Sequence, residues 1–192
     1  MRRYDAIELV LRLAGDRPIV GNLGPTSDEL WHAGHRDRNF YTYGNMGLVS
    51  SIGLGMALAT DEQIIALDGD GSLLMNLGSL ASIGRERPGN LIVLVYDNEA
   101  WGQTGHQMSH TGAGTSLEAA ALACGIKSAT TVNDLEELEG ALSTALATDG
   151  PHFIVAKIEE VGYLPVAPVE PEFTLYRFRN TFVQGQQPQP PH

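Results

Sequence analysis

The sequence has a single cysteine and few basic residues. Cys124 has no second cysteine to pair with, so an intrachain disulfide is excluded, and its alanine-rich surroundings predict a core position. The 12 lysines and arginines are outnumbered by 23 aspartates and glutamates, which gives a formal net charge of −11. This acidic balance argues against nucleic acid or an anionic membrane as the main partner. Small molecules and other proteins are the expected partners.

The sequence also lacks the apolar core of a signal peptide near its start, so we expect a cytoplasmic protein. Residues 41–60 need a membrane test, because they carry no charged side chain and match a bilayer span in length. Their four glycines and several hydroxyl side chains are too polar for the hydrocarbon interior. We expect a tightly packed, buried helix there, entered through a glycine-rich loop.

Short apolar runs alternate with segments of helical periodicity. The runs are residues 18–21, 63–67, 90–96 and 152–156, and the helical segments are 4–14, 48–59, 72–83, 116–124 and 134–147. Runs that are apolar throughout are typical of parallel strands covered by helices on both sides. We therefore predict an α/β domain over residues 1–183, a doubly wound, mostly parallel sheet with helices on both faces, followed by a disordered tail at 184–192.

Glycine, acidic and amide residues follow the predicted strands, where ligands bind in such sheets. The 63–67 strand leads into Gly69-Asp70-Gly71-Ser72. The glycines allow a sharp turn, Ser72 can cap the next helix, and free backbone amides at a helix start suit a phosphate group. Asp70 adds a carboxylate, which suits a magnesium ion that bridges carboxylate and phosphate. On this segment alone, an ordinary Asp-Gly turn is an equal alternative.

The next predicted strand ends in Asp97-Asn98. Because the carboxyl ends of neighbouring parallel strands meet at one sheet edge, Asp70 and the amide oxygen of Asn98 could share one cation with a backbone carbonyl such as that of Ala100. The sequence thus predicts Asp70, Asn98 and Ala100 as Mg²⁺ ligands.

In this pattern the chain resembles the thiamine diphosphate enzymes, whose diphosphate-binding domain carries Gly-Asp-Gly and, a little under thirty residues later, Asn-Asn. The resemblance implies that Asp70, Asn98 and the Ala100 carbonyl hold Mg²⁺. It also implies contacts between thiamine diphosphate and Gly69, Gly71 and Ser72. This chain has Asp97 in place of the first Asn, a position that is not a metal ligand in the family.

A second segment, Gly44-Asn45-Met46-Gly47, resembles the stretch of this family that contacts the pyrimidine ring of the cofactor. The resemblance implies that the Gly44 carbonyl accepts a hydrogen bond from the aminopyrimidine and that Met46 supports the bent cofactor. A glycine leaves its carbonyl accessible and methionine is a soft apolar filler, so both residue types suit these roles. The alternative for Met46 is an ordinary core position.

From residue 22 to 179 the sequence is more specifically similar to the β subunit of sulfopyruvate decarboxylase and to the matching half of phosphonopyruvate decarboxylase. The similarity is carried by residues 43–48, 50–55, 68–80 and 101–107. It implies a subunit of a thiamine diphosphate- and Mg²⁺-dependent carboxy-lyase that acts on a small anionic 2-oxo acid. Sulfopyruvate, converted to sulfoacetaldehyde and CO₂, is the first choice. Phosphonopyruvate decarboxylation, or another thiamine-dependent decarboxylase or carboligase activity, is the alternative.

In this family the glutamate that activates the cofactor lies on a separate pyrimidine-binding domain, and no glutamate of this chain can be assigned to it. The resemblance therefore implies an α subunit that carries the pyrimidine domain in a hetero-oligomer, without which we expect this chain to be inactive. A length of 192 residues is enough for one such domain but not for two.

Three further features carry weaker signals. His106 and His110 follow the third run, and His106 is kept as a candidate catalytic residue against the alternative of a solvated loop histidine. Arg177 and Arg179 alternate with aromatic residues, which favours a strand or a docking segment. A receiver-like, Mg²⁺-binding signalling module, with Lys157 at the end of a late strand, is the non-enzyme alternative.

Overall fold

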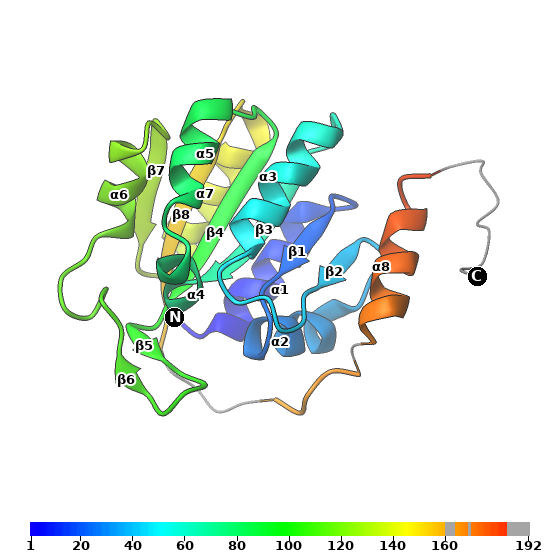
Figure 1. The fold of residues 1–192 in the computed structure, drawn as a ribbon, viewed down its shortest axis with the longest axis horizontal. Coiled ribbons are helices and arrows are strands. Elements are labelled where there is room, and N and C mark those ends of the chain that lie inside the picture. The colour runs from blue at the N-terminus through cyan, green and yellow to red at the C-terminus, as the bar shows by residue number, and fades with distance from the viewer. Residues whose placement is uncertain (160–163, 169, 184–192) are drawn as a thin grey trace.

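A computed structural model describes residues 1–159, 164–168 and 170–183, and these fold around one central sheet with helices on both faces (Figure 1). The predicted tail at 184–192 lies outside the described residues. The strands are β1 Ile19–Gly21, β2 Asn39–Tyr41, β3 Ile64–Gly69, β4 Leu91–Asp97, β5 Ala100–Trp101, β6 Gln107–Met108, β7 Ser128–Val132 and β8 His152–Lys157. The helices are α1 Arg3–Ala14, α2 Pro25–Gly34, α3 Val49–Ala59, α4 Asp70–Met75, α5 Ser79–Glu86, α6 Leu117–Ala123, α7 Leu135–Ala147 and α8 Pro171–Asn180.

The central sheet has six parallel strands in the order β2-β1-β3-β4-β8-β7, and β5 and β6 form a separate antiparallel hairpin. The chain first moves outward from β1 to β2 and then returns to place β3 on the other side of β1. The direction of winding therefore reverses between β1 and β3. In sheets of this kind, ligands bind beyond the carboxyl ends of the strands at such a reversal.

Two apolar clusters cover the two faces of the sheet. Successive residues of a strand point to opposite faces, so Leu94 of β4 packs in the cluster that contains α1, α2 and α7. Val93 and Val95 pack in the cluster that contains α3, α5 and α6. β4 is buried along its whole length because both faces are covered. The predicted doubly wound, parallel α/β fold is confirmed.

The uncharged segment at 41–60 contains the last residue of β2, a loop and the 11-residue helix α3. A Cβ at Gly53 would lie 2.9 Å from the Cβ of Ala66 in β3, so this helix packs closely on the sheet, as predicted. Among the described residues, no helix has the length and apolar character needed to cross a membrane. Cys124, at the end of α6, is half-buried and packs against the second cluster.

The prediction of one helix over 72–83 is wrong. The structure has two helices, α4 and α5, with a break at residues 76–78. Asn76 ends α4, and its side-chain amide donates to the Gly47 carbonyl oxygen at 2.9 Å. Asparagine side chains often bond to backbone groups in this way and interrupt helices. The break is therefore set by a contact that lies far away in the sequence.

Of the two alternatives for residues 176–179, a strand or a docking segment, the strand is wrong, because these residues belong to α8. The buried residues of α8 are Thr174, Arg177 and Phe178, which share one helical face. Arg177 donates to the backbone carbonyl oxygens of Arg36 and Asn39, both at 2.7 Å. Arg177 is thus a structural residue that attaches α8 beside β2.

Gly84 in α5 is a position where two helices leave no room for a side chain. A Cβ there would lie 1.9 Å from the Cys124 carbonyl oxygen at the end of α6, whereas a Cβ at Gly140 in α7 would meet nothing within 4 Å. We expect Gly84→Ala to lower the free energy of unfolding by about 2–3 kcal/mol through overpacking. Gly140→Ala should raise it by about 0.5–1 kcal/mol, because alanine favours a helix interior over glycine. Urea denaturation measures both, and equal midpoints for the two variants would contradict this packing.

Candidate functional site

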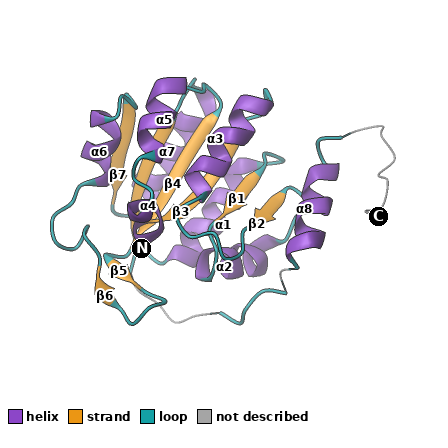
Figure 2. Ribbon diagram, viewed as in Figure 1, coloured by secondary structure: helices purple, strands orange, loops and turns teal. Residues whose placement is uncertain are grey.

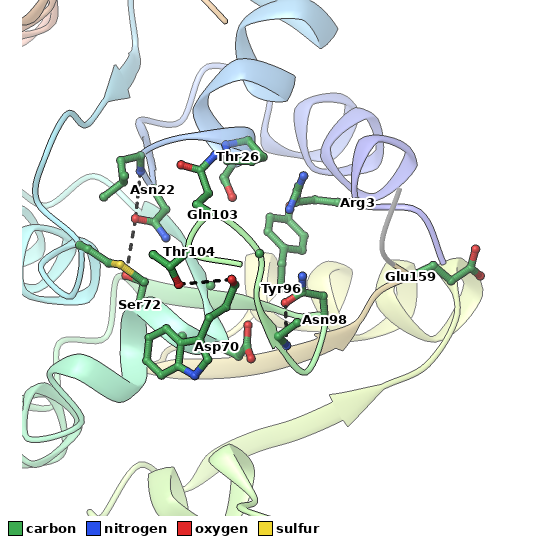
Figure 3. Close-up of a pocket in the computed structure, with 18 residues that line it drawn as sticks. Arg3, Asn22, Thr26, Asp70, Ser72, Tyr96, Asn98, Gln103, Thr104 and Glu159 are labelled. Carbon is green, nitrogen blue, oxygen red and sulfur yellow. Dashed lines mark hydrogen bonds between the residues drawn. The ribbon is translucent and has the colours of Figure 1, made fainter. Parts of the chain in front are cut away.

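A pocket lies at the carboxyl ends of β1, β3 and β4, where the winding reverses (Figure 3). Three connections form most of its wall, namely the β1–α2 loop, the β3–α4 turn and the segment from Asn98 into the β5–β6 hairpin. The hairpin lies at the same end of the molecule as α4, where loops gather (Figure 2). The predicted site residues that line this one pocket are Met46, Gly69, Asp70, Gly71, Ser72, Asn98 and Ala100. Gly44 and His106 are not among its lining residues.

Asp70 is the first residue of α4, and it is only 3% exposed. Its Oδ2 accepts hydrogen bonds from Ser109 Oγ at 2.5 Å and from Thr111 Oγ1 at 3.2 Å. Burial raises the pKa of Asp70, the bond from Ser109 opposes this shift, and the charge of Asp97 adds to it. No ion pair with a basic side chain is found for Asp70 among the described residues.

Two of the neighbouring buried acids, Glu29 and Asp97, are paired with a basic side chain. Glu29 of α2 receives two hydrogen bonds from Arg3, at 2.8 and 2.9 Å. Asp97 is bonded by Lys157 Nζ at 2.8 Å. Asp68, whose pKa burial also raises, accepts from a serine hydroxyl and does not line the pocket. Within the described part of the chain, Asp70 is therefore the buried acid that faces the pocket with hydroxyl and backbone N–H partners and without a basic side chain.

The oxygen atoms at and near Asp70 are suitable ligands for a hard cation. The Asn98 side-chain oxygen accepts from the Ala100 amide at 3.3 Å, and this turn brings both residues to the pocket wall. One carboxylate, one amide oxygen and a backbone carbonyl are the oxygen ligands that Mg²⁺ favours, with water or phosphate completing its shell. No group of three or more His, Cys, Asp or Glu side chains placed to hold a metal exists among the described residues. The residues present fit Mg²⁺ bound together with a phosphate ligand.

Ser72 does not cap α4, contrary to the prediction. The residue before α4 is Gly69, and no side chain caps the helix. The Ser72 hydroxyl instead accepts a hydrogen bond from the Gly47 amide at 3.0 Å. Together with the bond from Asn76 to the Gly47 carbonyl, this fixes the 44–47 loop on α4. Met46 is thereby held at the pocket, partly exposed.

The β5–β6 hairpin packs against two glycines of the pocket. A Cβ at Gly71 would lie 2.9 Å from the Trp101 ring, so this turn allows no side chain there. Gly24 has a φ of +67°, and a Cβ on it would lie 3.0 Å from the Gln103 amide. His106 is an exposed residue of the hairpin loop, and the His110 ring stands edge-on to Trp101 with centroids 6.3 Å apart.

Several pocket residues were missed by sequence reasoning. Arg3 lies near the start of the chain and reaches the pocket through α1. The Tyr96 hydroxyl is buried and has no hydrogen-bond partner among the residues that the structure describes, and burial raises the pKa of Tyr96. Neither residue belongs to a local motif, so the sequence holds no signal for it. Asn22, by contrast, follows the first strand in the glycine- and amide-rich pattern that marks the site.

Comparisons with known proteins agree with this geometry. Residues 20–156 match the family model described as thiamine pyrophosphate enzyme, C-terminal TPP binding domain. The sulfopyruvate decarboxylase subunit beta of Methanocaldococcus jannaschii is 46% identical over 157 residues, which cover 81% of this chain and 83% of that subunit.

Two further similarities involve longer proteins. The phosphonopyruvate decarboxylase of Streptomyces viridochromogenes is 44% identical over 153 residues, which cover 79% of this chain and 38% of that enzyme. The solved structure of a thiamine diphosphate-dependent 4-hydroxybenzoylformate decarboxylase from Rhodococcus jostii matches with a TM-score of 0.68 at 22% identity, covering 83% of this chain and 32% of that one. At this identity the structural match supports the fold alone.

The Asp97–Lys157 pair generates a stability prediction. Burial lowers the pKa of Lys157, the hydrogen bonds to Asp97 and Glu99 raise it, and the net shift is upward. Lys157→Met should lower the free energy of unfolding by about 2 kcal/mol, because it leaves the charge of buried Asp97 without its cation. The cost is below that of a fully buried pair, since the Lys157 side chain is 32% exposed.

The same change is also made in an Asp97→Asn variant. Asn is the residue that the Asn-Asn motif of the thiamine diphosphate enzymes has at this position. There the same Lys157→Met change should cost little, so chemical denaturation of the four proteins should give a coupling energy of about 1–2 kcal/mol. Equal costs in both backgrounds would show that Asp97 does not depend on Lys157.

Proposed function

The chain belongs to the thiamine pyrophosphate enzymes, in the family of their C-terminal TPP-binding domain, and from this premise we propose that it is the β-type subunit of a sulfopyruvate decarboxylase. The proposed reaction converts sulfopyruvate to sulfoacetaldehyde and CO₂ with thiamine diphosphate and Mg²⁺ as cofactors. The proposal also places the enzyme in the cytoplasm and gives it a small anionic substrate. Family membership leaves the receiver-like signalling module without support.

One observation carries the cofactor part of this proposal. The buried carboxylate of Asp70 faces a pocket without a basic partner among the described residues, and Asn98 and Ala100 line the same pocket. A buried charge without compensation is costly, so a cation bound there would stabilise the site. A cation also makes the pocket attractive to an anionic ligand in a protein whose net charge is −11.

We assign the chain's own residues as follows. Asp70, Asn98 and the Ala100 carbonyl hold Mg²⁺. The backbone around Gly69, Gly71 and Ser72, which lines the same pocket, contacts the diphosphate. The 44–47 loop, in which Gly44 is exposed, would contact the rest of the cofactor through the Gly44 carbonyl and Met46. When bound, thiamine diphosphate supplies the electron sink for the carbanion that loss of CO₂ leaves.

The proposal includes a partner subunit. The chain covers most of a decarboxylase β subunit but only 38% of a phosphonopyruvate decarboxylase chain, which suggests that another polypeptide provides the remaining domain. That pyrimidine-domain α subunit would supply the activating glutamate in a hetero-oligomer. Exposed apolar side chains at Tyr43, Met46 and Met75, on the two segments beside the pocket, are consistent with a protein surface that covers it.

The substrate is the finer part of the proposal, with phosphonopyruvate as the alternative because of the 44% identical relative. His106 stays a candidate for contact with substrate, on a hairpin that borders the pocket. This chain, combined with the α subunit, thiamine diphosphate and Mg²⁺, should release CO₂ from sulfopyruvate faster than from phosphonopyruvate or pyruvate, and this chain alone should release none. Faster release from phosphonopyruvate or pyruvate would replace the substrate assignment.

Asp70→Asn tests the cofactor site directly. The variant keeps the shape of the side chain and removes the charge, so Mg²⁺-dependent binding of thiamine diphosphate should fall by at least about 100-fold. The ligand-free protein should be as stable as the parent or more stable, because an uncompensated buried charge is gone. Calorimetric titration with and without Mg²⁺ gives the affinity, and Glu99→Gln, at an exposed acid between β4 and β5, is the control. Unchanged binding by Asp70→Asn would remove Asp70 from the site.

A further inference from the structure

Two hydroxyl side chains meet Asp70 from the far end of the β5–β6 hairpin. Ser109 follows β6 directly, Thr111 lies two residues later, and both are buried. Neither lines the pocket. We propose that Ser109 and Thr111 are positioning residues that orient the Asp70 carboxylate for its cation and couple cation binding to the hairpin. This inference rests on the proposed function for the presence of the cation.

The distances show which carboxylate each of the two hydroxyls bonds more strongly. Ser109 Oγ donates to Asp70 Oδ2 at 2.5 Å, the shortest of the group. Thr111 Oγ1 has one proton and lies 2.7 Å from Asp97 Oδ1 but 3.2 Å from Asp70 Oδ2, so its stronger bond goes to Asp97. The two hydroxyls lie 2.8 Å apart. Ser109 is therefore the principal partner of Asp70, and Thr111, which is bonded to Asp97, lies beside the Ser109 hydroxyl.

Which oxygen of the Asp70 carboxylate accepts the hydroxyl bonds determines which oxygen is left for a metal. Both hydroxyls approach Oδ2 and leave Oδ1 unengaged by them. A carboxylate whose one oxygen is held by a buried hydroxyl has a restricted rotation, so the other oxygen is presented in a single direction. Partners of this kind orient metal ligands, and their removal typically costs about 10–100-fold in metal affinity.

The same contacts tie the hairpin to the site at both ends. Ala100, a proposed ligand, begins β5. Ser109 directly follows β6, and its backbone amide donates to the Glu99 carbonyl oxygen at 2.8 Å. A cation shared by Asp70 and Ala100 would therefore bridge the two ends of the 100–108 hairpin. The hairpin carries Trp101 against Gly71, so its order should respond to cation binding.

The test compares variants that lack each hydroxyl with variants that keep a hydroxyl on a different side chain. Ser109→Ala and Thr111→Val remove the hydroxyls, Ser109→Thr and Thr111→Ser keep them, and Thr115→Val is the control at an exposed threonine of the same loop. Bound Mn²⁺, the probe for Mg²⁺, is measured from the paramagnetic resonance signal of the free ion in the presence of saturating thiamine diphosphate. Hydrogen exchange of residues 100–108 is followed with and without Mn²⁺.

We expect Ser109→Ala to weaken Mn²⁺ binding about 10-fold or more, Thr111→Val to weaken it less, and the two rescue variants and Thr115→Val to bind like the parent. Mn²⁺ should slow exchange in the hairpin of the parent and much less in Ser109→Ala. A purely structural role would instead lower the thermal midpoint of Ser109→Ala and leave its Mn²⁺ affinity unchanged, which would overturn the inference. All proteins are measured in complex with the α subunit, and if the parent complex bound no Mn²⁺ with thiamine diphosphate, the proposed function would fail together with the inference.

Discussion

The structure around the pocket depends on one constraint, the buried carboxylate of Asp70 that has no basic partner within the described residues. Removing a carboxylate from water is costly unless charge and hydrogen bonds compensate it. The surroundings meet this demand only in part, with Ser109 and Thr111 as hydroxyl partners. The other acids that crowd this edge, Glu29 and Asp97, are neutralised within the chain. Asp68 has no basic partner among the described residues either, but it does not line the pocket. Asp70 is therefore the described buried acid without a basic partner that a cation in the pocket can reach.

The fold explains why this position lies where it does. Parallel strands bring the ends of β1, β3 and β4 to one edge, and the reversal of winding between β1 and β3 separates the loops that follow them. Glycine at 71 allows the hairpin to approach the turn, and glycine at 53 allows α3 to pack on β3 behind it. The polar site is therefore supported by closely packed elements on the face that carries α3 and α4.

Much of this arrangement could be predicted from sequence, because its signals are local. Strands that are buried on both faces have continuous apolar runs, and the residues after them, such as Asp70 and Asn98, stand out by composition. Features set by long-range contacts could not be predicted. Asn76 divides the 72–83 segment through a bond to Gly47, and Arg177 makes α8 a helix packed on β2. The partners of Asp70 are 39 and 41 residues away in sequence, and nothing near them marks their role.

The central claim is that Asp70 and Asn98 bind a common ion at the end of two adjacent strands. Crystals grown with Mn²⁺ and thiamine diphosphate would test it most directly through the anomalous scattering of the metal. The account predicts one strong anomalous peak in direct coordination distance of an Asp70 carboxylate oxygen, the Asn98 amide oxygen and a diphosphate oxygen. A cofactor bound with its metal elsewhere, and with Asp70 outside the coordination shell, would contradict it.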